Sequence, residues 1–355
     1  MSRVRLSTGW QVGIVLALAL AGCHREVLED IPSADSRKIT IADRFYDVVA
    51  LDAQKTLVCG YAGKILMTED GGYTWKIVPS GTDKSLYSIR FPDPTHGWIV
   101  GQDGLILHTE DGGKTWTRQT SGATVYLFSV DFVNEREGWA VGDKATYVRT
   151  TDGGKSWTLA KLASQEGLSA DEQLLAQEPV LYDVQFLDSK TGWIVGEFGN
   201  IWHTTDGGQN WKTQQQTLIG EGIYDTLDIP TFFGASFTNG SNGIVAGLET
   251  KVARTRDGGS TWRFEQIDMT EGVGDPLYQP FQFADTTAWA VGAAAVVVHQ
   301  RSVGEPWLRV PVGEDVNTWL RGVYFVDKND GWVVGGFGTI LHTTDGGQTW
   351  LRALG

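Results

Sequence analysis

The stretch Gly97-Trp-Ile-Val-Gly101, followed by Thr109-Glu-Asp-Gly-Gly-Lys-Thr-Trp116, decides the fold because both of its parts return along the chain. The closing Gly of the first part and the Trp of the second are 15 residues apart in all seven copies. The sixth copy keeps this spacing to Trp307 although Ser302-Val-Gly304 replaces the Asp-Gly-Gly turn. A unit repeated at fixed spacing is the signature of a repeat architecture.

Each copy is expected to form four short strands. The first alternates apolar and polar residues, as in Leu86-Tyr-Ser-Ile-Arg-Phe91, and turns rich in Gly, Asp and Asn separate the others. One such sheet buries little, whereas seven sheets around an axis share a continuous core. The sequence therefore predicts an all-β chain with one seven-bladed β-propeller of four-stranded blades over 43–355. The blades are expected at about 43–79, 80–120, 121–160, 180–215, 231–266, 275–311 and 317–355, with insertions at 160–179 and 213–231.

Composition excludes several function classes. The chain has 355 residues with 29 Lys and Arg against 43 Asp and Glu, which gives a net charge of −14. Nucleic-acid binding depends on basic side chains that displace counterions, so no nucleic-acid partner is expected. Two cysteines cannot make a disulfide framework or a Cys-rich zinc site.

The first 22 residues are expected to be a lipoprotein signal peptide. Arg3 and Arg5 precede an apolar run from Trp10 to Ala21, which is shorter than the roughly 20 residues of a membrane-spanning helix. The run ends in Leu20-Ala-Gly-Cys23, which resembles the bacterial lipoprotein box and predicts lipidation at Cys23. The alternative is an ordinary signal peptide with an incidental cysteine. His24 in place of Asp favours the outer membrane over the inner, on the periplasmic side. Residues 23–42 would form a tether, in which Lys38–Ala42 could pair with an outer sheet edge.

The repeated polar residues are expected to be structural. In each Asp-Gly-Gly turn a carboxylate would accept hydrogen bonds from turn N–H groups, and the glycines would supply positive φ. This interpretation excludes a catalytic role for Asp70, Asp111, Asp152, Asp206, Asp257 and Asp345. Four histidines, His108, His203, His299 and His342, occupy the same third-strand position of different blades. Equivalent atoms there would lie about 10 Å or more apart, too far for one zinc ion. No metal, cofactor or catalytic residue is predicted.

The combined elements resemble the photosystem II stability and assembly factor family of cyanobacteria and chloroplasts. The resemblance covers about residues 43–355 and rests on Tyr-x-Ile-x-Phe, Gly-Trp-Ile-Val-Gly and Asp-Gly-Gly-x-Thr-Trp at one spacing. It implies a non-enzymatic, seven-bladed protein that assists the assembly of a membrane complex by binding one of its subunits. Photosynthetic members carry an Arg-rich surface, whereas this chain is acidic, so a different partner is expected, such as an envelope transporter. The protein is expected to be monomeric by itself.

Loops at one end of the propeller are the expected binding surface, because rigid scaffolds carry function on loops. An acidic rim with scattered aromatic residues would suit a basic or amphipathic segment, although solvated loops without a single role are the alternative. The candidates are Asp103, Asp143, Glu197, Phe198, Glu249 and Phe337 in turns, Tyr126, Tyr182 and Trp319 at the channel mouth, and Tyr224 and Asp225 in the second insertion.

A glycan-binding or glycoside-hydrolysing propeller is the second functional hypothesis. Hydrolysis needs two carboxylates about 5–9.5 Å apart, and Asp225 and Glu197 are the candidate pair.

Overall fold

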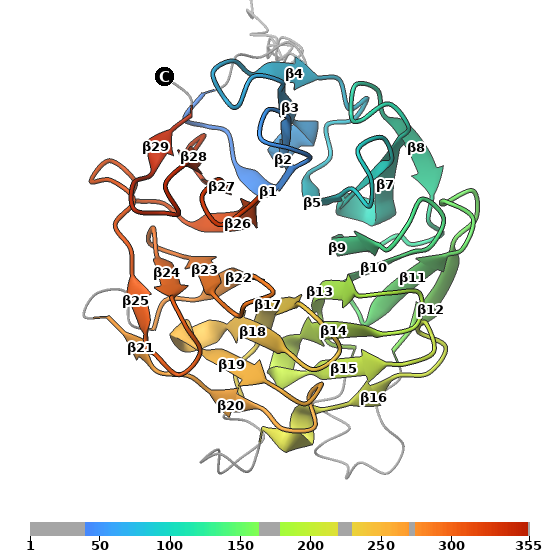
Figure 1. Cartoon of the computed structure of the whole chain (residues 1–355). Helices are drawn as coiled ribbons and strands as arrows, with labels where there is room; N and C mark the ends of the chain where they lie inside the picture. Colours follow the sequence, from blue (N-terminus) through green and yellow to red (C-terminus); the bar gives the residue numbers. More distant parts are fainter. Residues whose placement is uncertain (1–39, 163–177, 219–228, 270–273, 354–355) are drawn as a thin grey trace, which may run out of the picture. The chain divides into compact units, whose positions relative to one another are not determined.

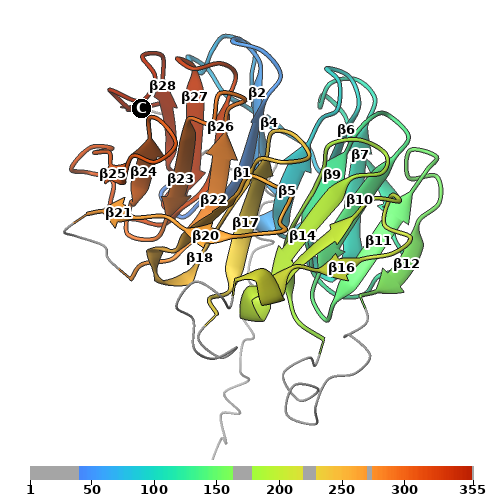
Figure 2. The same ribbon diagram turned by 60° about the horizontal axis from the view of Figure 1, so that its bottom comes forward.

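The chain forms an all-β propeller, which confirms the predicted fold class (Figure 1). A computed structural model describes residues 40–162, 178–218, 229–269 and 274–353. The predicted signal segment, Cys23, Tyr224, Asp225 and most of the first insertion lie outside the described residues. Within these residues, seven sheets surround a central channel, and each sheet runs outwards from the first strand of its blade (Figure 2).

The strands follow the repeat, so that each blade is continuous in sequence. The first four blades are β1 (Phe45–Ala50), β2 (Thr56–Gly60), β3 (Ile65–Thr68), β4 (Lys76–Val78); β5 (Leu86–Arg90), β6 (Gly97–Gly101), β7 (Leu105–Thr109), β8 (Thr117–Thr120); β9 (Leu127–Phe132), β10 (Gly138–Gly142), β11 (Thr146–Thr150), β12 (Thr158–Lys161); and β13 (Leu181–Phe186), β14 (Gly192–Gly196), β15 (Ile201–Thr204), β16 (Lys212–Thr213). The last three are β17 (Phe232–Phe237), β18 (Gly243–Gly247), β19 (Val252–Thr255), β20 (Arg263–Phe264); β22 (Leu277–Gln282), β23 (Ala288–Gly292), β24 (Val297–Gln300), β25 (Trp307–Arg309); and β26 (Leu320–Phe325), β27 (Gly331–Gly335), β28 (Ile340–Thr343), β29 (Leu351–Arg352).

The sixth sheet differs from the prediction because it has five strands. An extra strand, β21 (Ile267–Asp268), comes from the connection before the blade and pairs in parallel with β25. This is the blade that lacks the Asp-Gly-Gly turn. The additional strand covers an outer edge whose N–H and C=O groups would otherwise be unpaired.

Aromatic side chains hold neighbouring blades together. Trp98 of β6 is fully buried and stacks on Phe132 of the next blade, with ring centroids 3.6 Å apart. Trp157, from the Asp-Gly-Gly turn of that next blade, meets the edge of Phe132 at 5.8 Å. The same three-ring arrangement recurs at Trp139, Phe186 and Trp211. Large buried aromatic rings contribute strongly to a core, which accounts for the high Trp content of the repeat.

The second glycine of the Asp-Gly-Gly turn also serves this packing. Gly72 has φ +91°, and a Cβ atom built on it would lie 2.5 Å from the Trp332 ring of the neighbouring blade. Gly347 stands in the same relation to Trp289, at 2.2 Å. Glycine is therefore required at these positions both for its conformation and for the space that the tryptophan occupies.

In the part of the chain that the structure describes, the ring closes between the seventh and first blades without exchange of a strand. Trp332 meets Trp75 edge to face at 5.7 Å, and β1 packs beside β26. Residues 40–43 add a main-chain link, since the Gly338 N–H donates to the Asp43 carbonyl at 2.7 Å. Lys64 is buried and forms an ion pair with Asp43 at 2.8 Å. The described part of the 38–42 segment, residues 40–42, forms a turn and not the predicted edge strand.

Cys59 is fully buried in the first blade, and burial raises the pKa of its thiol well above the ordinary value. The thiol is therefore unreactive in the folded protein. No helix among the described residues is long and apolar enough to cross a membrane.

Candidate functional site

The turn geometry that repeats from blade to blade accounts for the repeated aspartates. Asp111 Oδ1 accepts hydrogen bonds from the N–H groups of Lys114 and Thr115, both at 2.9 Å, and from the Thr109 hydroxyl at 2.8 Å. Its other oxygen accepts from the Thr115 hydroxyl at 2.6 Å. Although slight burial opposes it, these bonds lower the pKa of Asp111 to about 2. Similar Thr and main-chain contacts surround Asp70, Asp152, Asp206, Asp257 and Asp345. The carboxylates thus face their own turns.

The four third-strand histidines each stack on the second-strand Trp of their own blade. The centroid distances are 4.5 Å for His108 on Trp98 and 3.9 Å for His299 on Trp289. Burial lowers the pKa of His299 to about 4, so the ring is neutral at pH 7. His342 also contacts the Asp330 carboxylate through Nε2, at 2.9 Å. These contacts belong to packing within separate blades.

The predicted turn candidates lie at one end of the propeller, next to the start of each first strand. Phe45 at the start of β1, for example, pairs with Gly60 immediately before the turn between β2 and β3. Asp103 forms an ion pair with Lys84 at 2.8 Å, and Glu197 accepts the Val180 N–H at 2.8 Å. Asp143 accepts the N–H of the following Lys144 at 3.0 Å. Several predicted acidic residues are therefore engaged within the chain.

The remaining turn candidates, Phe198, Glu249 and Phe337, are all exposed. Phe198 and Phe337 are apolar and 43% and 58% exposed, while Glu249 shares their left-handed backbone with φ near +57°. Leu248 and Tyr61 are exposed apolar residues in equivalent turns that the prediction did not include. This end of the propeller thus presents separated apolar side chains from several blades.

A closed ring of side chains surrounds the channel mouth at the second position of every first strand. Neighbouring centroids along its aromatic part lie 4.9–5.7 Å apart. Arg321 completes the ring, with its guanidinium carbon 5.7 Å from the centre of Tyr46 and 5.8 Å from that of Tyr278. We call these seven residues the collar: Tyr46, Tyr87, Phe128, Tyr182, Phe233, Tyr278 and Arg321.

The three predicted mouth residues differ in their relation to the collar. Tyr182 is part of it, Trp319 stacks on Tyr46 at 5.7 Å, and Tyr126 lies outside Tyr87 at 6.1 Å. The prediction missed that six of seven blades supply an aromatic residue at one position. An alignment of the seven first strands against one another would have revealed that column.

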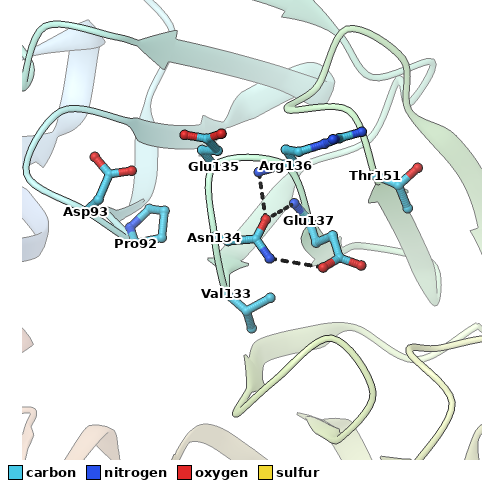
Figure 3. A pocket seen from close by; sticks show the side chains of 8 residues that line it. All are labelled: Pro92, Asp93, Val133, Asn134, Glu135, Arg136, Glu137 and Thr151. Atoms are coloured by element: carbon cyan, nitrogen blue, oxygen red, sulfur yellow. Dashed lines mark hydrogen bonds between the residues drawn. The ribbon is translucent and has the colours of Figure 1, made fainter.

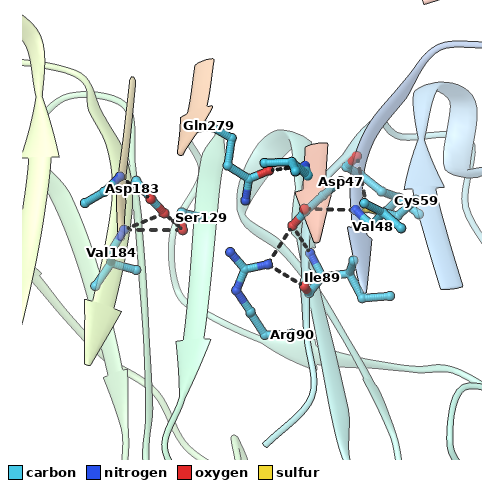
Figure 4. A network of polar contacts seen from close by, with 12 residues as sticks. Asp47, Val48, Cys59, Ile89, Arg90, Ser129, Asp183, Val184 and Gln279 are labelled. Atoms are coloured by element: carbon cyan, nitrogen blue, oxygen red, sulfur yellow. Dashed lines mark hydrogen bonds and ion pairs between the residues drawn. The ribbon is translucent and has the colours of Figure 1, made fainter. Parts of the chain in front are cut away.

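Below the collar, polar side chains join the first strand of one blade to that of the next (Figure 4). Asp47 accepts the Ile89 N–H and an Arg90 Nη1–H, both at 3.0 Å. Three blades further along the chain, Asp183 accepts the Ala235 N–H at 2.9 Å and the Ser129 hydroxyl at 2.6 Å. The inner edge of each sheet has no further strand, so these side chains satisfy N–H groups that would otherwise be unpaired.

We call the charged and polar side chains below the collar the belt: Asp47, Arg90, Ser129, Asp131 and Asp183. Burial raises the pKa of Asp131 to about 7 and also raises the pKa of Asp183. Burial alone would lower the pKa of Arg90, but Asp47, Asp183 and Asp131 more than offset it, so the Arg90 pKa is raised. Arg90 is therefore the cation that permits several carboxylates to line a narrow channel, with a cavity of about 40 Å³ between collar and belt. The sequence analysis did not identify these residues.

At the opposite end, an open pocket lies between the second and third blades (Figure 3). Asp93, His96 and Glu135 stand near it with candidate metal-ligand atoms within 4.8 Å of one another. Asp93, however, is engaged in its own turn, where it accepts the Thr95 and His96 N–H groups at 2.7 and 2.8 Å. Its second oxygen contacts His96 Nδ1 at 2.9 Å. Asn134 organises the next turn in the same way, through the N–H groups of Arg136 and Glu137.

Comparison with known proteins adds the family. The family model described as "Photosynthesis system II assembly factor YCF48" matches residues 33–123, 75–167, 168–229 and 224–317. The photosystem II assembly lipoprotein Ycf48 of Synechococcus sp. (strain CC9902) is 27% identical over 155 residues, which cover 41% of this chain and 44% of that protein. The chloroplastic stability/assembly factor HCF136 of Arabidopsis thaliana is 27% identical over 77 residues, which cover 21% of this chain and 19% of that protein. The chain thus matches less than half the length of either relative.

Solved structures agree with the fold. A YCF48 bound to a D1 peptide has a TM-score of 0.56 at 22% identity, covering 76% of this chain and 82% of that one. YCF48 from Cyanidioschyzon merolae has a TM-score of 0.58 at 24% identity, covering 78% and 86%. A GH74 xyloglucanase from Xanthomonas campestris has a TM-score of 0.69 at 12% identity, covering 89% of this chain and 55% of that one. At these identities the structures support only the propeller fold. Together with the repeat and the blade packing, the match of the family model over residues 33–317 shows that the chain belongs to the photosystem II assembly factor YCF48 family.

Proposed function

We propose that this protein is a non-enzymatic, lipid-anchored scaffold that binds a membrane protein in the cell envelope and assists assembly of its complex. Family membership is the observation that carries the proposal. The exposed apolar turn residues Phe198, Leu248 and Phe337 support it, because exposed apolar side chains on a rigid frame are suited to protein contact. The Cys23 box and a relative named as a lipoprotein support anchoring.

The partner is proposed to differ from a photosystem subunit. The D1 peptide is bound by a related protein that is 22% identical to this chain. The net charge of −14 distinguishes this chain from a basic binding protein, so the partner is expected to be another envelope complex, such as a transporter. By itself the protein is proposed to be monomeric and to require no cofactor.

Photo-cross-linking in intact cells tests the function. A photoreactive residue placed at Glu249, on the turn end, should capture a membrane protein that mass spectrometry identifies repeatedly. The matched position is Tyr73, which is 91% exposed in an Asp-Gly-Gly turn at the other end of its blade, and should not give that adduct. Identical yields at both positions, or no membrane protein at Glu249, would contradict the proposal.

Glycan binding is the second candidate, and the likeness to a GH74 xyloglucanase favours it. Glu197 is described and accepts the Val180 N–H, while Asp225 lies outside the described residues. A glycan array and a glycoside screen with Glu197→Gln distinguish the candidates. Turnover that disappears in this variant would establish hydrolysis, and saccharide capture without a membrane protein would establish glycan binding.

A further inference from the structure

The seven turns between second and third strands share one backbone conformation but differ in the side chain at the tip. Their tip residues all have left-handed backbone, with φ from 50° to 57°: Ala62, Asp103, Lys144, Phe198, Glu249, Ala294 and Phe337. Bulky side chains are disfavoured in this conformation, and alanine at two tips indicates that the turn needs no large side chain. Phe198 and Phe337 combine the disfavoured backbone with an exposed ring. Neither property stabilises the isolated protein, which makes both residues candidates for a binding function.

Phe337 differs from Phe198 because an aromatic path connects its turn to the channel. The residue before it, Gly336, is the only glycine at its position among the seven turns, where the others carry a side chain. A Cβ atom on Gly336 would lie 2.3 Å from the Thr318 hydroxyl and 3.0 Å from the Trp319 indole. Trp319 in turn stacks on Tyr46 of the collar with an interplanar angle of 9°. We call Phe337, Trp319 and Tyr46 the aromatic track.

Further apolar residues border the outer end of this track. Ile41 is 80% exposed and lies in the segment whose main chain contacts Gly338, next to Phe337. Tyr61 is about half exposed in the adjacent turn of the first blade, where its N–H donates to the Arg44 carbonyl. The described residues that line this corner come from the two blades at which the ring closes.

Arginines lie beside the track, although the whole chain is acidic. Arg352 donates to the Phe337 carbonyl at 3.3 Å and also pairs with Asp315. Arg321 lies over Tyr46 and Arg44 lies over Tyr61, with guanidinium carbons 5.7 and 5.5 Å from the ring centres. Within the described residues, neither arginine has a carboxylate partner. Acidic residues gather instead near Tyr182, on the far side of the collar, where Glu197 and Asp143 influence that tyrosine. A ligand that lies along the track would therefore meet Arg321 at the channel end and Arg44 beside the outer end.

We propose that the aromatic track is the docking site for a peptide segment of the partner that carries apolar side chains and at least one carboxylate. The inference rests on the proposed function and specifies the ligand of that surface. The apolar side chains pack on Phe337 and Trp319, while the carboxylate pairs with Arg321, which the stacking contacts hold in place. This proposal differs from the expectation of a basic segment on an acidic rim.

Two synthetic peptides test the chemistry. Both are 12 residues long with the same leucine and phenylalanine positions, and they carry either glutamate or lysine at the polar positions. The intact lipoprotein, solubilised in detergent, is titrated against each fluorescein-labelled peptide by fluorescence anisotropy. The glutamate peptide should bind saturably and at least tenfold more tightly than the lysine peptide.

Variants then locate the site. Phe337→Ala should weaken the glutamate peptide at least tenfold without lowering the melting temperature, because Ala62 and Ala294 occupy equivalent tips. Gly336→Ala, whose added Cβ would crowd the Thr318 hydroxyl and the Trp319 indole, should weaken the peptide as well. Tyr73→Ala, which removes an exposed aromatic at the other end, is the matched control and should bind normally. Arg321→Gln should abolish the preference for glutamate over lysine.

Several outcomes would overturn the inference: no saturable binding of the glutamate peptide, equal binding of the lysine peptide, or unchanged binding by Phe337→Ala. The cross-linking experiment separates this failure from failure of the proposed function. If Phe337→Ala still captures the same membrane protein from the Glu249 position, the function stands and the track is wrong. If the unmodified protein captures none, the proposed function itself fails.

Discussion

The Glu265 carboxylate accepts a hydrogen bond from the indole N–H of Trp307, at 2.8 Å, across the boundary between the fifth and sixth blades. Its other oxygen accepts from Arg254 Nε at 2.6 Å. Arg254 also donates to Gln300 of the sixth blade. The blade that lacks its own Asp-Gly-Gly turn is thus held by a polar network anchored in its neighbour.

Replacing Glu265 should therefore destabilise the propeller strongly. Glu265→Ala leaves the Arg254 guanidinium buried without its carboxylate, a change that costs about 3–5 kcal/mol in comparable sites. Urea denaturation followed by tryptophan fluorescence measures the loss. Glu69→Ala removes one partner of an exposed pair with Lys76 and should leave the midpoint unchanged. Equal midpoints for Glu265→Ala and the unmodified protein would contradict this prediction.

The stability of the fold should decrease over two separate pH ranges as the pH is lowered. Burial lowers the pKa of His108, His203 and His299, so their unfolded forms take up protons first and stability falls below about pH 6.5. The pKa of Asp111 is lowered to about 2 in the fold, despite some burial, by its turn hydrogen bonds. Its contribution is therefore present above about pH 4 and lost as the pH falls toward 2.

Thermal melts between pH 7.5 and pH 3 measure this dependence. The melting temperature should decline gradually at first and more steeply below about pH 4, where the Asp-Gly-Gly carboxylates begin to protonate. A melting temperature that stays constant over the whole range would show that these groups are not perturbed in solution.

Asp131 should have the opposite pH dependence. Burial raises its pKa to about 7, whereas an unfolded Asp releases its proton near pH 3.9. The bound proton thus stabilises the fold at low pH, and that contribution is lost as the pH rises through 7. Asp131→Asn keeps an acceptor for the Phe186 N–H without the charge, so it should be more stabilising at pH 8.5 than at pH 5. The same stability difference at both pH values would refute the assignment; Asp143→Asn, in an exposed turn, is the control.

Membrane attachment should depend on one cysteine. Cys23→Ser removes the proposed acylation site and should move the protein from the membrane pellet to the soluble fraction, because each buried methylene contributes about 0.8 kcal/mol to anchoring. Cys59→Ala is the matched variant, since that thiol is buried in the first blade, and it should stay in the pellet. Retention of Cys23→Ser in the pellet would exclude lipidation as the anchor.

The blades were predictable because each copy carries a closing Gly and a Trp at the same spacing. The spacing from Gly101 to Trp116 recurs even where the turn chemistry is lost, as it does before Trp307. Strand β21 was not predictable, since Ile267–Asp268 belongs to an irregular connection and pairs in parallel with a strand far along the chain. The candidate site shows the same division. Phe337 was identified from its turn. The aromatic column of the collar is visible in the sequence when the first strands are aligned, but the contact of Arg321 with Tyr46 depends on the closure of the ring.

The contact between Trp332 and Trp75 lies at the blade boundary that closes the ring. Every other blade boundary joins neighbours in the chain, so those contacts are short in sequence and can form in order as the polypeptide emerges. The last blade must instead find the first, and among the described residues side-chain packing and a few main-chain bonds fasten them. Hydrogen exchange under native conditions should accordingly be faster along this boundary than along the other six. A ligand that rests on the aromatic track would contact both blades at this boundary and stabilise their association. Binding at the site should therefore slow amide hydrogen exchange along the boundary.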